Sequence, residues 1–251
     1  MSGSLGAVAV PGLPEIVAGD DLGALIAGHA DPPPTGADIV VVCHKAVAKA
    51  EGRLVDLDDV TPGAPARELA ARLDRDPALV ELVLAESGRI VRAEPSVLIT
   101  ETRQGWVCAN AGIDRSNVPG DRTVALLPVD ADASARRIRD ELEGAAGVRP
   151  AVVVSDSFGR PWRLGQAEVA IGCAGIEPLD DWRGRVDAGG QPLEATRAAV
   201  ADLAAGIGGL LQVKDAGTPI SVISGLGRHV IATDGPGAGA LRRPSGEDLF
   251  R

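Results

Sequence analysis

The chain is organised around Ala109-Asn110-Ala111-Gly112-Ile113-Asp114-Arg115-Ser116-Asn117, read together with Ser155-Asp156-Ser157-Phe158-Gly159-Arg160-Pro161-Trp162-Arg163. Each stretch places one carboxylate, Asp114 or Asp156, directly after an apolar run that predicts a strand. We therefore expect both acids in loops at strand ends, among hydroxyls, amides and small residues. Oxygen-rich loops of this kind suit a hard divalent cation such as Mg²⁺ or Mn²⁺. The second stretch also carries Arg160 and Arg163, which suit the recognition of phosphate or carboxylate groups.

The apolar pattern on either side of these stretches predicts alternating strands and helices. The runs at 39–43 and 150–154 are continuous and rich in valine, which predicts buried strands. Shorter strands are expected at 8–10, 90–92, 97–102, 106–109, 123–127, 169–172 and 218–223, with a hairpin turn at 103–105. Helical spacing predicts helices at 22–26 (capped by Asp20), 64–73, 77–86, 130–143 and 193–211. Asp130 and Asp132 open the fourth helix and are interpreted as capping residues rather than metal ligands.

The composition excludes several classes of partner. A formal net charge of −10 argues against nucleic acid or an anionic membrane as a bulk partner. A phosphorylated ligand in a locally basic pocket stays possible, with five candidate residues: Lys45, Lys49, Arg53, Arg160 and Arg163. No apolar run reaches the roughly 18 residues of a membrane span. The three cysteines form no CxxC pair, so we expect buried thiols in a reducing compartment and a cytoplasmic protein.

Two features near the predicted strand ends have more than one interpretation. The basic segment 44–53 follows a buried strand, where α/β proteins bind ligands, but a solvated helix start explains it equally well. It lacks the glycine spacing of a Walker loop. The Ser-Asp-Ser triplet at 155–157 is compatible with a hydrolase, yet no GxSxG motif is present. Only His44 of the three histidines lies beside a candidate site, which disfavours a Ser-His-Asp triad.

A set of motifs in a fixed order resembles the coenzyme F420-0:L-glutamate ligase family. The motifs are Gly12-Leu13-Pro14-Glu15, 45–53, 109–118, 126–130, 155–163, 170–172 and 243–251. They span nearly the whole chain, and 109–118 and 155–163 are the most specific. Actinobacterial members of this family often carry a second, nitroreductase-like domain. We expect residues 1–251 to form a single ligase domain without that second domain.

The resemblance implies a fold and an activity. The family fold is a mixed α/β (α+β) arrangement in two intertwined lobes, and its members form homodimers. The implied reaction joins the amine of L-glutamate to a carboxylate of F420-0, a deazaflavin phosphodiester, and gives a γ-linked glutamyl tail, GDP and phosphate. GTP is expected to convert the carboxylate to an acyl phosphate before the amine attacks. Mg²⁺ or Mn²⁺, two per site, would neutralise charge on the transferring phosphate, and K⁺ is a further candidate.

The resemblance also assigns roles to individual residues. By match to the motifs, three residues would hold the metals: Asp114, Asp156 and Ser157. The nucleotide would meet Leu13, Pro14, Glu15, Ile16 and Asn117, with Lys49 against the phosphates. A looser match adds Gln212 and Lys214. The family often has Thr or Ser where this chain has His44, which can still donate a hydrogen bond to the nucleotide.

Arg160 and Arg163 have no role assigned by the resemblance. On chemical grounds we assign them to substrate anions, although a salt bridge within the fold explains them equally well. Three other functions fit the same residues: a ligase of the same mechanism acting on another carboxylate, a metal-dependent phosphohydrolase, and a non-catalytic nucleotide-binding protein. Glutamate-dependent release of phosphate would separate the ligase from the hydrolase.

Overall fold

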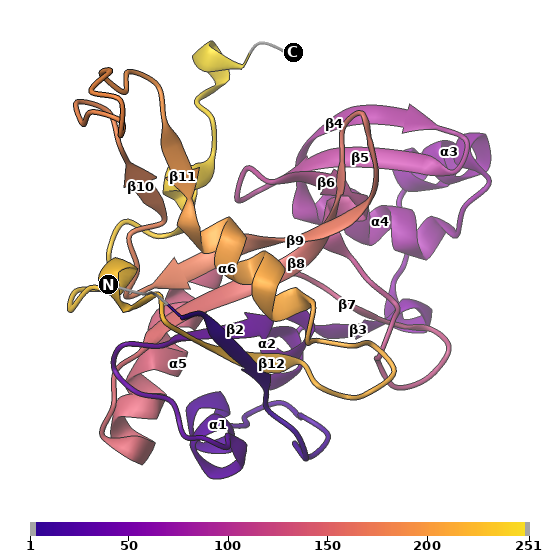
Figure 1. The fold of residues 1–251 in the computed structure, drawn as a ribbon. Coiled ribbons are helices and arrows are strands. Elements are labelled where there is room, and N and C mark those ends of the chain that lie inside the picture. Colours follow the sequence, from indigo (N-terminus) through magenta and orange to yellow (C-terminus); the bar gives the residue numbers. More distant parts are fainter. Residues whose placement is uncertain (1–3, 249–251) are drawn as a thin grey trace.

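A five-stranded mixed sheet runs through the middle of the molecule in the order β1-β12-β2-β8-β9 (Figure 1). The computed structural model describes residues 4–248, so the last three residues of the motif at 243–251 lie outside the described residues. The two central strands, β2 (Ile39–Cys43) and β8 (Ala151–Arg160), are parallel. The other three strands pair antiparallel and are β1 (Gly6–Ala9), β12 (Ile220–Ser224) and β9 (Arg163–Ala174). The expected mixed α/β class is therefore confirmed.

The continuous valine runs form the centre of this sheet because side chains alternate between its two faces. Val40 and Val42 pack into one apolar cluster with α1 (Leu22–His29), α2 (His44–Ala50) and α5 (Ala131–Ala146). Val41 packs on the other face against α6 (Val200–Gly209). Gly208 of α6 lies so close to Val41 that an added Cβ would stand 2.7 Å from the valine Cβ. Both faces are covered by helices, which explains why neither central strand alternates with polar residues.

A second group of helices and strands lies beside the central sheet (Figure 1) and contains a further apolar cluster. Its helices are α3 (Ala64–Leu73) and α4 (Pro77–Glu86), with the predicted ends at both. Its strands are β4 (Ser87–Glu94), β5 (Val97–Thr102), β6 (Val107–Ala109) and the pair β3 (Leu54–Asp56) and β7 (Thr123–Ala125). The predicted hairpin turn at 103–105 joins β5 and β6, with Gly105 at φ +87°. The longest helix among the described residues, α5, has 16 residues, and none is long and apolar enough to cross a membrane.

Three local predictions are wrong. Asp21 rather than Asp20 caps α1, because its carboxylate accepts a hydrogen bond from the Ala24 amide at 2.7 Å. The helix expected at 193–211 begins only at Val200, because Arg197–Ala199 forms strand β11 against β10 (Leu179–Asp181). Strand β8 does not end at Val154: it continues to Arg160 because it pairs with β9 along its whole length, across a bulge at Val154/Ser155. Asp156 therefore lies within a strand and not in a loop.

Candidate active site

A cavity of about 960 Å³ opens at the carboxyl ends of the parallel strands β2 and β8. This edge is where ligands bind in many α/β sheets, because loops from adjacent strands diverge there. The lining side chains come from five segments that are distant in sequence, within 13–18, 43–54, 117–119, 155–168 and 212–219. The structure brings most of the predicted site residues to its wall: Leu13, Pro14, Glu15, Ile16, His44, Lys49, Asn117, Asp156, Ser157, Gln212 and Lys214.

One wall of the cavity is α2, which begins directly after β2. His44 and Lys45 at its start are 2% and 9% exposed. A solvated helix start, one of the two interpretations of this segment, is therefore wrong. The second lysine, Lys49, also lines the cavity and pairs with Glu15 at 2.5 Å. Because Glu15 is largely exposed, this ion pair is weak and leaves the Lys49 ammonium available to an anionic ligand.

Asp156 reaches the cavity from the middle of β8 and is buried. One carboxylate oxygen, Oδ1, contacts His44 Nδ1 at 2.9 Å and accepts a hydrogen bond from the Ser157 amide at 2.7 Å. No hydrogen bond reaches the other oxygen, Oδ2, from any residue between 4 and 248. The carboxylate is thus held by one oxygen and offers the second to a ligand.

Ser157 and Glu168 face each other across the β8–β9 pair. The Ser157 hydroxyl donates a hydrogen bond to Glu168 Oε1, and both side chains line the cavity. Because the Ser157 hydroxyl proton points toward Glu168, the lone pairs of the Ser157 oxygen point away from that carboxylate. Sequence reasoning missed Glu168, and the signal that identifies it is cross-strand: it is the register partner of Ser157.

Asp114 lies in a loop after β6 that contains three consecutive residues with left-handed backbone angles. Asn110, Ala111 and Gly112 have φ values of +53°, +53° and +74°. Asp114 Oδ2 accepts from Lys45 Nζ at 2.7 Å and from the Ser116 hydroxyl at 2.9 Å, and Oδ1 accepts from the Ser116 amide. Asp114 does not itself line the cavity. The Lys45 side chain lines the cavity and contacts Asp114, so it lies between the cavity and this carboxylate.

The electrostatics of Asp114 follow from these contacts. Burial alone raises the pKa of a carboxyl. Here the hydrogen bonds from Lys45 and Ser116, together with the charge of Lys45, outweigh burial and hold the pKa of Asp114 well below its usual value. Asp114 is therefore a carboxylate that already has its counter-ion.

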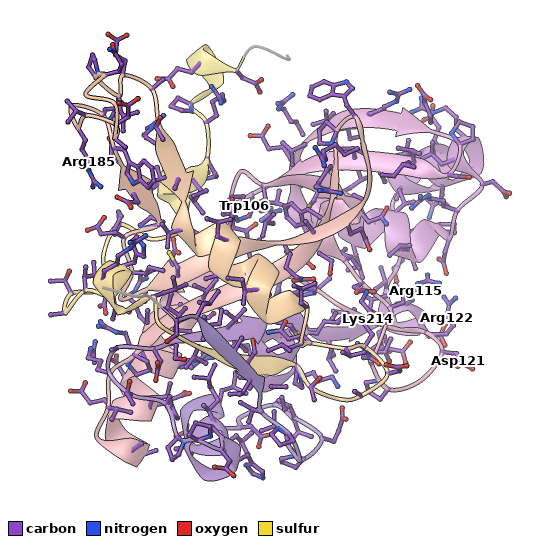
Figure 2. The ribbon with its side chains drawn as sticks, in the orientation of Figure 1. Trp106, Arg115, Asp121, Arg122, Arg185 and Lys214 are labelled. Carbon is purple, nitrogen blue, oxygen red and sulfur yellow. The ribbon has the colours of Figure 1, made fainter. Side chains whose placement is uncertain are left out.

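The residues expected to meet the nucleotide come from loops that contact each other. Asn117 Nδ2 donates to the Lys214 carbonyl at 3.0 Å, which joins the loop after β6 to the loop after α6. Figure 2 labels Lys214 in the second of these loops and Arg115 in the first. Gln212 Nε2 donates to the Val41 carbonyl at 3.0 Å. The Gln212 Oε1 and Ser155 Oγ atoms are buried without a hydrogen-bond partner in the described part of the chain. Buried polar atoms of this kind at a cavity wall are suited to a bound ligand.

Arg160 and Arg163 are not brought to this cavity. They lie at the exposed tip of the β8–β9 hairpin, where Arg160 donates to the Leu164 carbonyl at 2.6 Å. Within residues 4–248 neither arginine forms a salt bridge, so that alternative is also without support. In a single copy of the chain, these two guanidinium groups are distant from the other predicted site residues.

The geometry bears on two of the chemical alternatives. His44 and Asp156 resemble the His-Asp pair of a hydrolase triad, but His44 Nε2 is buried and has no hydroxyl partner among the described residues. A Ser-His-Asp triad is therefore absent from this part of the chain. The described residues also contain no group of three or more His, Cys, Asp or Glu side chains that could hold a metal by themselves.

Comparisons with known proteins identify the family of this chain. The model of the family F420-0:Gamma-glutamyl ligase matches residues 12–225. The chain is 41% identical over 248 residues to "Coenzyme F420:L-glutamate ligase" of Methanothermobacter thermautotrophicus, which covers 97% of this chain and 98% of that protein. A protein with the same name from Methanopyrus kandleri is 42% identical and covers 93% and 92%. One from Halobacterium salinarum is 45% identical and covers 86% and 85%. This chain therefore belongs to the F420-0:gamma-glutamyl ligase family.

Proposed function

We propose that this protein is a GTP-dependent ligase that joins the amine of L-glutamate to a carboxylate of coenzyme F420-0, and so acts in coenzyme F420 biosynthesis. The products are a γ-linked glutamyl amide, GDP and phosphate. The observation that carries this proposal is that four of the family motifs, 12–15, 45–53, 109–118 and 155–163, contribute residues to one cavity at the carboxyl edge of the central sheet. A cavity of about 960 Å³ is large enough for a nucleotide and a second ligand together.

The oxygen atoms at one wall fit a hard divalent cation. Asp156 Oδ2 is free of hydrogen bonds from the described residues, and the Ser157 hydroxyl and Glu168 carboxylate lie on the same two strands. Three such groups leave most of a cation's coordination to water and phosphate oxygens, which is the usual pattern for Mg²⁺. We propose Mg²⁺ or Mn²⁺, two per site, held by Asp156, Ser157 and, once Lys45 has moved away, Asp114. Glu168 lies beside them, and K⁺ is a further candidate. When bound, the cations would neutralise charge on the transferring phosphate.

The side chains of the chain then perform the remaining steps. Lys49 leaves its weak contact with Glu15 and binds the nucleotide phosphates, while Asn117, Gln212 and Lys214 hold the nucleotide from the facing loops. The F420-0 carboxylate attacks the terminal phosphorus, and the bond from that phosphorus to the GDP oxygen breaks. The glutamate amine then attacks the acyl carbon, loses a proton and expels phosphate. Holding both reactants in one cavity converts this second step into an intramolecular reaction.

We also propose a homodimer, in which the β8–β9 hairpin of one copy reaches the other. Two large apolar residues at the hairpin tip, Trp162 and Leu164, are 80% and 97% exposed. Apolar groups that gather at an exposed tip favour burial against a partner. Arg160 and Arg163 on the same hairpin would then meet substrate anions of the second copy's cavity.

Mass spectrometry of F420-0 incubated with GTP, Mg²⁺ or Mn²⁺ and L-glutamate tests the proposal. We expect a product heavier by one or more glutamyl residues, and phosphate release that requires both glutamate and F420-0. Phosphate release without glutamate would identify a phosphohydrolase instead. Binding of nucleotide without any turnover would identify a non-catalytic protein. Asp59→Asn is the control for substitutions of the acids at the site. It removes an exposed carboxylate that does not line the cavity, and it should leave turnover unchanged.

A further inference from the structure

His44 lines the cavity and contacts a carboxylate there with one of its ring nitrogens. Its Nδ1 lies 2.9 Å from Asp156 Oδ1, and the side chains of His44 and Asp156 are 2% and 11% exposed. The sequence resemblance assigns His44 to the nucleotide. In the structure the ring contacts Asp156 of the neighbouring strand β8, a contact that the resemblance does not predict.

The position of the ring follows from the parallel pairing of β2 and β8. Cys43, the last residue of β2, is the register partner of Ser155. This pair is followed by His44, the first residue of α2, and by Asp156 within β8, and the side chains of these two residues lie next to each other at the same edge. The contact is therefore fixed by the central sheet and not by a mobile loop.

The contact leaves the two oxygens of Asp156 in different states. The His44 ring and the Ser157 amide both meet Oδ1, while Oδ2 receives no hydrogen bond from the described residues. A carboxylate with one oxygen fixed in this way loses the freedom to rotate. Because the carboxylate is already fixed, cation binding does not have to restrict its rotation, and this favours binding.

The other ring nitrogen argues against a role in stability. His44 Nε2 is buried without a hydrogen-bond partner in the part of the chain that the structure describes. Burying an unpaired nitrogen disfavours the folded state, and an apolar residue of similar size would avoid that penalty. A histidine is retained here at a disadvantage to stability, which is typical of a residue kept for its contact at a functional site.

We propose that His44 is a positioning residue for Asp156: its Nδ1 donates a hydrogen bond to Oδ1 and leaves Oδ2 as the oxygen that takes a divalent cation. This inference rests on the proposed function, because it presumes a cation at Asp156. It gives His44 a role that acts through another residue, without direct contact to nucleotide or substrate.

The test compares two substitutions of nearly equal shape, His44→Asn and His44→Leu. The Asn amide nitrogen can take the place of Nδ1 and donate to Oδ1, whereas Leu cannot donate. Binding of Mn²⁺ alone is measured by electron paramagnetic resonance of the free ion. We expect His44→Leu to weaken binding roughly 10- to 100-fold, the usual effect of removing a supporting contact at a metal site. His44→Asn should stay within about threefold of wild type on the same reasoning.

A second set of measurements separates positioning from structure. The melting temperature of His44→Leu should not fall along with its Mn²⁺ affinity. The reason is that this variant also removes the unpaired, buried Nε2. In the ligase assay, the Mn²⁺ concentration for half-maximal rate should rise while kcat at saturating Mn²⁺ changes little. His29→Leu is the control, and it should bind Mn²⁺ like wild type. Among residues 4–248, the His29 side chain bonds only the Leu25 carbonyl of its own helix.

The outcomes are distinct. Equal Mn²⁺ affinity in wild type and His44→Leu would overturn the inference and leave the proposed function standing. The inference would also be overturned if a folded His44→Asn lost as much Mn²⁺ affinity as His44→Leu. The hydrogen-bond donor that Asn retains would then make no contribution to Mn²⁺ binding. Absence of Mn²⁺ binding in wild type would overturn the inference together with the proposed cation site. If His44→Leu does not fold, His44→Gln carries the same comparison, since its amide stands at the Nε2 position.

Discussion

Asp114 and Asp156 are equivalent in the sequence and different in the structure. Asp156 lies within β8, held through one oxygen by His44 and with the other oxygen free of hydrogen bonds from described residues. Asp114 lies in a left-handed loop, and both its oxygens are engaged by Lys45 and Ser116. One acid is ready for a cation. Under the proposed function, Asp114 takes a cation only after Lys45 moves away, so we expect ligand binding to include a rearrangement of charge.

The largest expected effect is on turnover. Asp156→Asn should lower glutamate-dependent phosphate release by about 1,000-fold, because it removes the carboxylate that faces the cavity directly. Asp114→Asn should lower it less, by about 100-fold, since Asp114 stands behind Lys45. Steady-state rates at saturating GTP and Mn²⁺ measure both. Equal losses in the two variants would contradict the difference drawn between the two acids.

The next effect is on stability, and it compares a glycine from each stretch. Gly112→Ala should destabilise the protein by about 2 to 3 kcal/mol, because left-handed angles strain an alanine. Its φ is +74°, and an added Cβ would stand 2.6 Å from the Leu127 side chain. Gly159→Ala should change stability by less than about 0.5 kcal/mol, as for most exposed substitutions. No atom lies within 4 Å of the Cβ at that position. Urea unfolding measures both, and similar midpoints would contradict the strained loop.

The elements that the sequence predicted best are those with local causes. The helices Ala64–Leu73 and Pro77–Glu86 have the predicted ends because a proline stands in the first turn of each. The second is also capped by Asp76. The runs at 39–43 and 150–154 form the sheet centre as expected, because only buried strands are apolar on both faces.

The parts that were missed depend on pairing between distant segments. Ser155 to Arg160 is polar and reads as a loop, yet it is a strand because β9 supplies its partners. Glu168 enters the site through the same pairing. The Lys45–Asp114 ion pair joins positions 69 residues apart, and no periodicity indicates it. The motifs identified which residues meet at the cavity, but not which of them contact each other.

A smaller effect concerns cation affinity when Lys45 is removed. Lys45→Met keeps an unbranched side chain of similar length and frees Asp114 from its counter-ion. Mn²⁺ alone should then bind about tenfold more tightly, because the ammonium no longer competes for the carboxylate. Turnover should nevertheless fall, since the nucleotide phosphates lose a cationic neighbour. Titration followed by electron paramagnetic resonance measures the affinity. Weaker Mn²⁺ binding in Lys45→Met would mean that Lys45 supports the cation site instead of blocking it.

The smallest effect is the acid dependence of stability, measured in metal-free protein with a chelator. The folded pKa of Asp114 lies below its unfolded value of 3.8, so its contribution to stability is fully present above that pH and is lost as the pH falls further. In Lys45→Met the main lowering cause is gone and burial raises the pKa. That variant should therefore lose less stability between pH 5 and acid than wild type.

Urea midpoints at a series of pH values give this comparison. Asp181, whose pKa is lowered to about 2 by hydrogen bonds from Arg183, titrates in the same range. It lies on β10, distant from Lys45, so its contribution is the same in both proteins and cancels in the difference. Parallel curves for wild type and Lys45→Met would show that Asp114 gains nothing from its ammonium partner. The electrostatic difference between the two acids would then disappear, and no movement of Lys45 would be needed for a cation to bind.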